Sequence, residues 1–460
     1  MGSKHIHFVG IGGIGMSAIA RVLLEDGYRV SGCDQNLSSI TEGLERLGIT
    51  VHEGHNPSHL QGVDTVIVTS AVKGDNPEIG AALEQGVPVV KRAEMLGRIM
   101  EDRYGIAIAG THGKTTTSSM ISVMLLRAGL DPTILVGGEI AELGSNGRLG
   151  KSPYLVVEAD EYDGSFLHLK PKIAVVTNID DDHLDYYGDK AAIVDAFYRF
   201  MALVPPDGHL VVCSDDLTLA SLEGVIPSVT GNITTYALGL PAHWSVKELR
   251  LNARGGTDFL LLHNGVTEGC ISLSIPGRHN VSNALAAVAV GHLLGLDMDT
   301  VTGALSDFQG AKRRFEIKGE VKGVTVVDDY GHHPTEVKAT LAAARERYGD
   351  RRLLCLFQPH TYSRTALLMG QFATAFTVAD EVCVTEIYAA REDNSWGVSG
   401  ADLANAIRVP KAVYTAGLEE AADRLAKELR PGDVLITMGA GDVYRAGEMV
   451  LEKLGAGIKV

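Results

Sequence analysis

The sequence predicts an α/β protein with three domains, each built around a largely parallel sheet. Short apolar runs of strand length alternate with stretches of helical periodicity, and most of these runs end in a glycine-rich turn or a polar cluster. Because parallel neighbours need a crossover helix between them, this alternation is typical of doubly wound sheets. At roughly 150 residues per domain, the 460 residues indicate about three domains. We expect them at residues 1–104, 105–312 and 313–460.

The composition is that of a globular cytoplasmic protein that does not bind nucleic acid. Lys and Arg number 41 against 57 Asp and Glu, a formal net charge of −16, whereas phosphate backbones require clustered basic residues. Five scattered cysteines without CxxC spacing indicate reduced thiols, not a disulfide frame or a zinc site. No apolar run reaches the ~18 residues of a membrane span, and the N-terminus lacks a signal pattern.

The first domain carries a dinucleotide-type glycine turn and is expected to be Rossmann-like. A strand over 5–9 runs into a GxGxxG turn, a helix follows over 14–25, and a second strand over 29–33 ends in Asp34. This arrangement places a pyrophosphate at the helix N-terminus and the acidic residue near a ribose hydroxyl. Alone it suggests NAD, but any nucleoside diphosphate conjugate fits, and a turn kept only for tight packing is the alternative. The candidate residues are Gly10, Gly12, Gly13, Gly15 and Asp34, with Ser70 after the strand at 63–68.

A phosphate loop opens the middle domain. The apolar strand at 106–109 leads into GTHGKTTT, and a helix leaves it. Glycines let backbone N–H groups approach phosphates, Lys114 neutralises the β/γ oxygens, and the Thr115 hydroxyl can hold Mg²⁺. The loop is two residues shorter than a strict Walker A motif, yet its context favours a nucleoside triphosphate. The loop residues concerned are Gly110, Thr111, His112, Gly113, Lys114, Thr115 and Thr116.

Acidic residues at neighbouring strand ends are candidates for a metal shell. The strand over 154–157 ends in Glu158, with Asp160 and Glu161 as competitors. His183 lies among several aspartates after the strand over 172–177. A lone histidine is more often structural than a ligand, so the spacing alone does not assign it.

The rest of the middle domain contains an antiparallel addition and a basic hinge. Residues 244–275 alternate apolar and polar, with Asn264 and Gly265 as a hairpin turn. Asn280 and Asn283, at the start of an Ala-rich helix, can hydrogen-bond a base or cap that helix. In the segment 309–315, arginines that include Arg314 can reach phosphates.

The last third predicts a second Rossmann-like, doubly wound sheet. Strands are expected at 324–329, 353–357, 381–385 and 433–438, each followed by polar residues at its carboxyl end. Residues 439–441 lack a third glycine and are not interpreted as another nucleotide site. The polar candidates here are Tyr330, His332, His360 and Arg364.

Three mononucleotide-like domains around a central phosphate loop resemble the Mur ligases, the ATP-dependent amide-forming enzymes of peptidoglycan synthesis. The resemblance spans nearly the whole chain, and VGIGGIGMS and DDYGHHP are its most discriminating stretches. The matching segments are residues 9–17, 110–117, 158–163, 182–185, 277–283, 328–334 and 358–364.

The resemblance implies roles that the spacing alone leaves open. The first domain would bind the UDP of a sugar substrate instead of NAD, and ATP would bind with two Mg²⁺ ions. Thr115, Glu158 and His183 become the expected metal ligands, and Arg364 is suited to pair the alanine carboxylate. Tyr330, His332 and His360 would complete the amino-acid site, and Asn280, Asn283 and Arg314 the ATP site. The expected catalytic residues are Lys114, Glu158, His183, His332 and Arg364.

The implied reaction joins L-alanine to the carboxylate of UDP-N-acetylmuramate through an acyl phosphate, in a monomer or homodimer. Two alternatives remain: a sister ligase that attaches a recycled peptide to the same sugar, and an NAD-dependent oxidoreductase built on the first glycine turn. Several sister ligases hold a metal with a carbamylated lysine on the helix after the His183 motif. Here residues 191–202 contain no lysine, and Lys190 lies too near the start of that segment to be an obvious replacement. We therefore expect the second metal to depend on His183, water and substrate phosphates.

Overall fold

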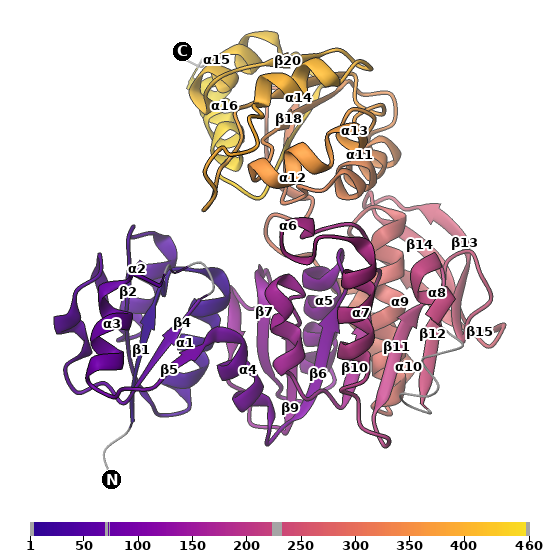
Figure 1. Cartoon of the computed structure of the whole chain (residues 1–460). Helices are drawn as coiled ribbons and strands as arrows, with labels where there is room; N and C mark the ends of the chain where they lie inside the picture. Colours follow the sequence, from indigo (N-terminus) through magenta and orange to yellow (C-terminus); the bar gives the residue numbers. More distant parts are fainter. Residues whose placement is uncertain (1–3, 70–71, 73, 223–231, 457–460) are drawn as a thin grey trace.

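The structure confirms the predicted α/β class, and its described residues form three sheets (Figure 1). This computed structural model describes residues 4–69, 72, 74–222 and 232–456. Sheet strands fall within residues 5–91, 104–272 and 316–438. Among the described residues, no helix is long and apolar enough to cross a membrane.

The first sheet has five strands in the order β3-β2-β1-β4-β5, and every pair is parallel. The chain moves outward from β1 to β3 and then returns to β4, so the strand order reverses between β1 and β4. In open α/β sheets such a reversal opens a ligand crevice at the strand carboxyl ends. The elements are β1 (His5–Val9), α1 (Ile14–Glu25), β2 (Arg29–Asp34), α2 (Ser39–Arg46), β3 (Thr50–Glu53), the 3₁₀ helix η1 (Pro57–Leu60), β4 (Thr65–Val68), α3 (Pro77–Glu84), β5 (Val89–Lys91) and α4 (Arg92–Met100).

The second sheet has ten strands in the order β15-β14-β13-β12-β11-β10-β6-β9-β7-β8. Its first half is β6 (Tyr104–Ala109), α5 (Lys114–Arg127), β7 (Thr133–Ile140), β8 (Ser145–Arg148), β9 (Tyr154–Glu158), η2 (Tyr162–His168) and β10 (Ile173–Val176). Its second half is α6 (Leu184–Tyr187), α7 (Lys190–Met201), β11 (His209–Cys213), α8 (Leu217–Leu222), β12 (Ile233–Tyr236), β13 (Trp244–Leu251), β14 (Thr257–His263), β15 (Val266–Ser272), α9 (Arg278–Leu293) and α10 (Met298–Asp307).

The centre of this sheet explains its continuous apolar runs. Strand β6 lies between β9 and β10, and residues 106–109 are fully buried, as expected for a parallel strand covered on both faces. Helix α5 is buried along most of its length and packs against α9. The predicted antiparallel addition is present, because β14 pairs antiparallel with both β13 and β15, and Asn264 and Gly265 connect β14 to β15.

The third sheet has six strands in the order β16-β17-β21-β18-β19-β20, parallel except for the β16–β17 pair. Its elements are β16 (Glu316–Val321), β17 (Val324–Asp329), α11 (Pro334–Tyr348), β18 (Leu353–Phe357), α12 (Tyr362–Leu367), α13 (Met369–Phe372), β19 (Glu381–Val384), α14 (Gly400–Ala406), β20 (Ala412–Tyr414), α15 (Leu418–Glu428), β21 (Val434–Met438) and α16 (Tyr444–Ala456).

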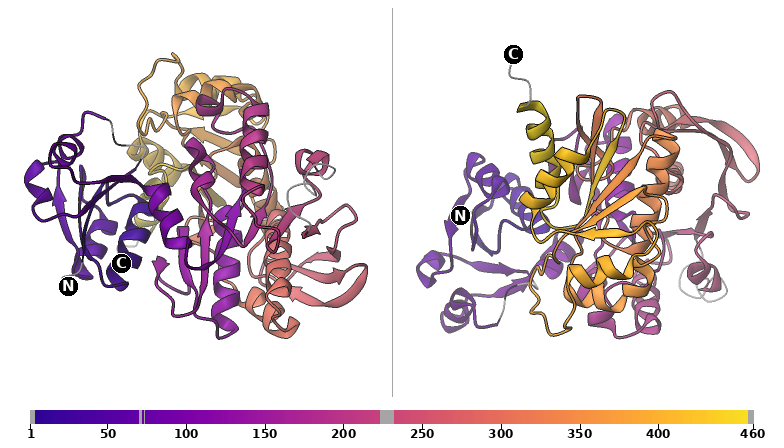
Figure 2. Two further views of the ribbon diagram at one scale, coloured as in Figure 1. Left: turned by 60° about the horizontal axis from the view of Figure 1, so that its bottom comes forward. Right: turned by 90° about the horizontal axis from the view of Figure 1, so that it is seen from above.

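The three sheets surround a common region (Figures 1 and 2). Helix α1 of the first part packs on β7 and β8 of the middle part, and α12 of the last part contacts α6. The β6 register aligns Ile108 with Glu158 of β9, and Ala109 with Val176 of β10. The loops after these three strands therefore open at one edge of the sheet, towards the third part of the chain.

Candidate active site

The phosphate loop lies between β6 and α5, as predicted, and its glycines are required by their surroundings. Gly110 and Gly113 have φ of 133° and 82°, in the region that favours glycine. A Cβ at Gly110 would lie 1.9 Å from the Thr177 hydroxyl, and one at Gly113 would lie 2.5 Å from Oδ1 of Asn283. The loop is thus packed against the end of β10 and against α9.

Lys114 is held by groups of its own loop and by one acidic residue. Its Nζ donates to the carbonyl oxygens of Gly110 and Thr111, at 2.5 and 3.1 Å, and to both carboxylate oxygens of Glu161, at 2.9 and 2.7 Å. Burial opposes the charge on Lys114, but Glu161 outweighs it and raises the lysine pKa. The sequence presented Glu161 only as a competitor for the metal, so this pairing was missed.

Thr115 and Glu158 come together in the way a hard cation needs. The Thr115 hydroxyl donates to Oε2 of Glu158 at 2.9 Å, and the Gly137 N–H donates to the same oxygen at 2.8 Å. The Arg314 guanidinium reaches the Thr115 hydroxyl at 3.4 Å, whereas Arg313 turns away to Asp328. The hydroxyl and carboxylate oxygens are donors that suit Mg²⁺, so this pair fits the metal that the loop motif implies.

His183 lies beside Glu161, the acidic partner of Lys114. Its Nε2 is 3.8 Å from Oε1 of Glu161 and 3.8 Å from Oδ2 of Asp182. No hydrogen bond or ion pair among the described residues links His183 to Glu158 or Thr115. The structure therefore brings Thr115 and Glu158 together and positions His183 separately, beside Glu161.

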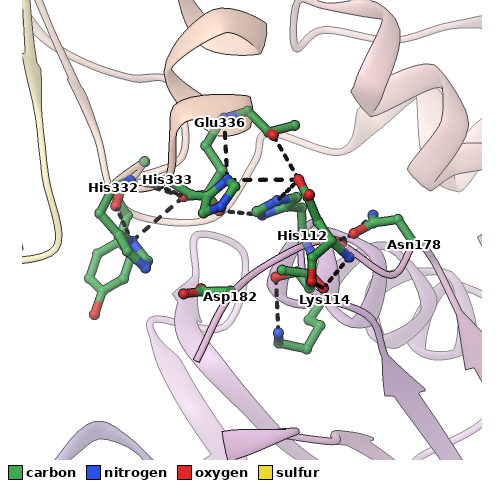
Figure 3. Close-up of polar contacts among 12 residues, drawn as sticks. His112, Lys114, Asn178, Asp182, His332, His333 and Glu336 are labelled. Carbon is green, nitrogen blue, oxygen red and sulfur yellow. Dashed lines mark hydrogen bonds and ion pairs between the residues drawn. The ribbon is translucent and has the colours of Figure 1, made fainter. Parts of the chain in front are cut away.

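A histidine and acid cluster joins the loop to the third part of the chain (Figure 3). Nε2 of His112 lies 3.1 Å from Asp180, and its Nδ1 lies 3.3 Å from Glu336 on α11. Burial would lower the pKa of His112, but its interactions with Asp180 and Glu336 raise it to about 9. His112 is thus charged near neutral pH and links the phosphate loop to the start of α11.

Glu336 also holds the turn before α11. Glu336 accepts hydrogen bonds from the backbone N–H groups of His332 and His333, at 2.9 and 3.2 Å, as in a capping box. Nε2 of His333 contacts the Asp181 carbonyl at 3.1 Å. Burial and the nearby Arg364 guanidinium lower the pKa of His332 to about 4, so its imidazole is neutral at pH 7.

Arg364 and His360 lie at a small cavity of about 100 Å³. Nε and Nη2 of Arg364 donate to the two Asp182 oxygens at 2.9 and 3.2 Å, and Nη1 contacts Nδ1 of His360 at 3.1 Å. The His332 ring is 5.6 Å from the His360 ring. The Tyr330 ring is likewise 5.6 Å from the His332 ring, and the guanidinium groups of Arg313 and Arg314 each lie 5.0 Å from it. Tyr330 also lines the larger cavity.

The larger cavity, of about 1190 Å³, extends across all three parts of the chain. The Gly12 N–H donates to Asp34 at 2.9 Å at the first glycine turn, and a Cβ at Gly12 would lie 2.8 Å from that carboxylate oxygen. Ser70 is outside the described residues. The lining includes Gly10, Gly13, Gly15, Asp34, Arg92, Glu158, Tyr330 and Arg391.

The two asparagines of α9 do not cap it. The cap residue is Gly277, without a side-chain hydrogen bond. Asn280 donates to the Pro276 carbonyl at 2.7 Å, and Asn283 donates to Asn280 at 3.3 Å while facing Gly113. The capping interpretation was wrong because the helix begins before both residues.

Comparison with known proteins assigns the chain to a family. Three family models match in succession: the Mur ligase family catalytic domain over residues 5–104, the Mur ligase middle domain over 108–291, and the Mur ligase glutamate ligase domain over 313–441. The chain belongs to the Mur ligase family.

Relatives within this family match over almost the full length. The chain is 46% identical over 453 residues to a UDP-N-acetylmuramate–L-alanine ligase from Caldanaerobacter subterraneus, covering 98% of each protein. It is 48% identical over 454 residues to a protein of the same name from Geotalea daltonii, with the same coverage.

Solved Mur ligase structures have the same architecture. The UDP-N-acetylmuramate-alanine ligase of Thermotoga maritima superposes with a TM-score of 0.83 at 30% identity, covering 98% of this chain and 99% of the other. A murein peptide ligase from Psychrobacter arcticus gives a TM-score of 0.75 at 28% identity, with both chains fully covered.

Proposed function

We propose that this Mur ligase joins L-alanine to the carboxylate of UDP-N-acetylmuramate, using ATP and releasing ADP and phosphate. The observation that carries the proposal is the continuous cavity from the first glycine turn to Glu158 beside the phosphate loop. A nucleotide-linked sugar bound in the first domain can extend along it and present its carboxylate at the loop. The names of the full-length relatives support the same substrates.

The phosphate loop is the proposed ATP site. Its backbone N–H groups face the phosphates, Lys114 exchanges its contacts with Glu161 for phosphate oxygens, and Arg314 approaches from the hinge. Asn283, which already abuts Gly113, extends the site towards the base together with Asn280.

Thr115 and Glu158 would hold Mg²⁺, and His183 is the proposed ligand of a second ion. When bound, Mg²⁺ neutralises charge on the phosphates. Lys114 and Arg314 add fixed positive charge on the same side, so a carboxylate can approach the γ-phosphorus without prohibitive repulsion.

The chemistry divides into two steps. A carboxylate oxygen of the sugar substrate forms a bond to the γ-phosphorus as the bond to the β-phosphate oxygen breaks, giving an acyl phosphate and ADP. The alanine ammonium group then loses a proton, and its nitrogen forms a bond to the acyl carbon. The bond from that carbon to the phosphate oxygen breaks, phosphate leaves, and the nitrogen loses a second proton. Nδ1 of His332 faces the Tyr330 carbonyl at 3.1 Å, so Nδ1 carries the hydrogen and Nε2 can accept a hydrogen bond from the alanine nitrogen and orient it.

Arg364→Ala should raise KM for alanine far more than KM for ATP. We propose that the alanine carboxylate binds Arg364 beside Asp182, and losing such a charge-assisted pair should cost on the order of 2–4 kcal/mol. Initial rates at varied alanine and varied ATP separate the two constants.

The matched control for this prediction is Arg424→Ala, which removes a partly buried arginine paired with Glu428 at 3.0 Å in the same part of the chain. It should leave both constants unchanged. Arg364→Lys should be intermediate, because lysine keeps the charge but not the two-pronged contact. An unchanged KM for alanine in Arg364→Ala would move the carboxylate contact elsewhere.

The test of the function is phosphate release with ATP, Mg²⁺ and UDP-N-acetylmuramate, scanned over single amino acids and a cell-wall tripeptide. Release should be fastest with L-alanine and should require all substrates together. Faster release with the tripeptide would indicate the murein peptide ligase activity instead. Nicotinamide-dependent absorbance change without phosphate release would favour an oxidoreductase.

A further inference from the structure

A cluster of histidine, cysteine and glutamate lies in the first part of the chain, apart from the proposed chemistry. It consists of His7 on β1, Cys33 on β2, His59 on η1 and Glu78 on α3. One ligand atom from each of the four lies within 4.8 Å of the other three. His7, Cys33 and Glu78 are fully buried, and the His59 side chain is 14% exposed.

The Glu78 carboxylate is at the centre of this cluster. Its Oε2 lies 3.2 Å from Nε2 of His7 and 3.0 Å from Sγ of Cys33. Its Oε1 lies 2.7 Å from Nδ1 of His59 and accepts the Asn56 N–H at 2.9 Å. Within the described part of the chain, no lysine or arginine forms an ion pair with Glu78.

The charges of the Glu78 carboxylate and the Cys33 thiol favour a metal site over a simple hydrogen-bonded core. Without a metal, a buried carboxylate faces two histidines and a thiol, and no permanently charged cation offsets it. With the thiol ionised, the set carries two negative charges, which a divalent cation neutralises. One thiolate, two imidazoles and one carboxylate are ligands of zinc, whereas Mg²⁺ and Ca²⁺ prefer oxygen.

A supporting layer of contacts around these four residues matches what metal ligands require. Nδ1 of His7 lies 2.8 Å from the Ser31 hydroxyl, which also contacts Nε2 of His5 at 2.8 Å. The His59 ring stacks on the His52 ring, with centroids 4.1 Å apart and planes 7° apart. Such second contacts orient ligating rings, and the partly exposed His59 provides a route for the ion.

We propose that one structural Zn²⁺ ion binds to His7, Cys33, His59 and Glu78. On binding, the thiol proton leaves to solvent, a sulfur–zinc bond forms, and no other covalent bond changes. The cysteine spacing predicted no zinc site because Cys33 has histidine and glutamate partners from three other elements. The ion fastens η1 and α3 to the sheet.

The site adjoins the proposed sugar-nucleotide cavity without being part of it. Nδ1 of His55 lies 3.2 Å from Sγ of Cys33, and His55 lines the large cavity, as do Asn76 and Pro77 next to Glu78. Zinc therefore stabilises the wall of that cavity. The zinc site does not depend on which substrate occupies the cavity.

Metal content of the full chain tests the proposal. Protein stripped by a chelator, given excess Zn²⁺ and Mg²⁺, and then dialysed should retain one zinc per chain and melt at a higher temperature than the stripped protein. Cys33→Ser should lower zinc affinity by more than about 100-fold, since even the loss of a supporting contact costs 10- to 100-fold. Cys270→Ser, at an exposed cysteine, is the matched control and should behave like wild type.

Cobalt identifies the ligands. With Mg²⁺ in excess to saturate oxygen sites, Co²⁺ should give a thiolate charge-transfer band in the near ultraviolet. The band should be lost in Cys33→Ser and kept in Cys270→Ser. His59→Asn, at the least buried ligand, provides a second variant if Cys33→Ser does not fold, and it should also lose zinc. Absence of retained zinc, or equal retention in Cys33→Ser and His59→Asn, would overturn the proposal.

Discussion

Lys114→Ala should abolish turnover while UDP-N-acetylmuramate affinity stays near that of the wild type. Lys114 lies at the phosphate loop, whereas the first glycine turn, where we propose that the sugar nucleotide binds, is in another part of the chain. Only the proposed ATP step therefore loses its cation. Removing one preorganised group that stabilises developing charge costs about 10²–10³-fold in rate, and we propose that Lys114 also contributes to ATP binding. Phosphate release measures turnover, and calorimetric titration measures affinity for the sugar nucleotide.

Two further variants make this experiment interpretable. Lys114→Ala leaves the buried Glu161 carboxylate without its lysine partner, which can destabilise the middle part of the chain. The double variant Lys114→Ala/Glu161→Ala removes both charges and should be folded and inactive. Lys170→Ala removes an exposed lysine paired with Glu101 at 2.7 Å and should be fully active. A steep fall in sugar-nucleotide affinity in the folded Lys114 variant would contradict the separation of the two sites.

His183→Ala should lose most of its rate, whereas Lys190→Ala should remain active. The prediction follows from the absence of a lysine in residues 191–202, which leaves His183 as the protein ligand of the proposed second metal. Lys190 is half exposed, and its Nζ lies 3.5 Å from Asp181. Activity should therefore not depend on dissolved CO₂, and ¹³C-bicarbonate should give no carbamate signal by NMR.

The backbone conformation at His183 makes asparagine a better replacement than alanine. Its φ is 55°, in the left-handed region, so alanine adds strain there as well as removing the imidazole. Asparagine tolerates this conformation, and His183→Asn should be as folded as the wild type and still slow. A dead Lys190→Ala that acetate restores, together with a carbamate signal, would show that the metal site has been assigned wrongly.

The positions of the candidate site residues could be predicted where the local sequence or the end of a strand determines them. Gly110 and Gly113 need backbone conformations and close approaches that other residues do not tolerate, so the loop is visible in the sequence. Glu158 is the last residue of β9, and the parallel register of β9 beside β6 brings it to Thr115. Adjacent parallel strands end at one edge, which is why carboxyl-end residues could be grouped without a structure.

Partners that come from distant segments could not be predicted, because no local rule relates them. Glu161 pairs with Lys114 only once the turn after β9 lies against the loop, and Asp182 pairs with Arg364 only once the third sheet is positioned beside the second. The sequence predicted that Arg364 pairs the alanine carboxylate, but it did not predict that Asp182 is its partner within the protein.

The sequence by itself determined the α/β class, the two glycine turns and the family resemblance, since these depend on periodicity and on local backbone demands. Only the tertiary structure decided that His112 joins Glu336 across two parts of the chain, and that Cys33 meets His7, His59 and Glu78. Contacts of that kind depend on how sheets and helices pack, because side chains tens of residues apart become neighbours only when their elements do.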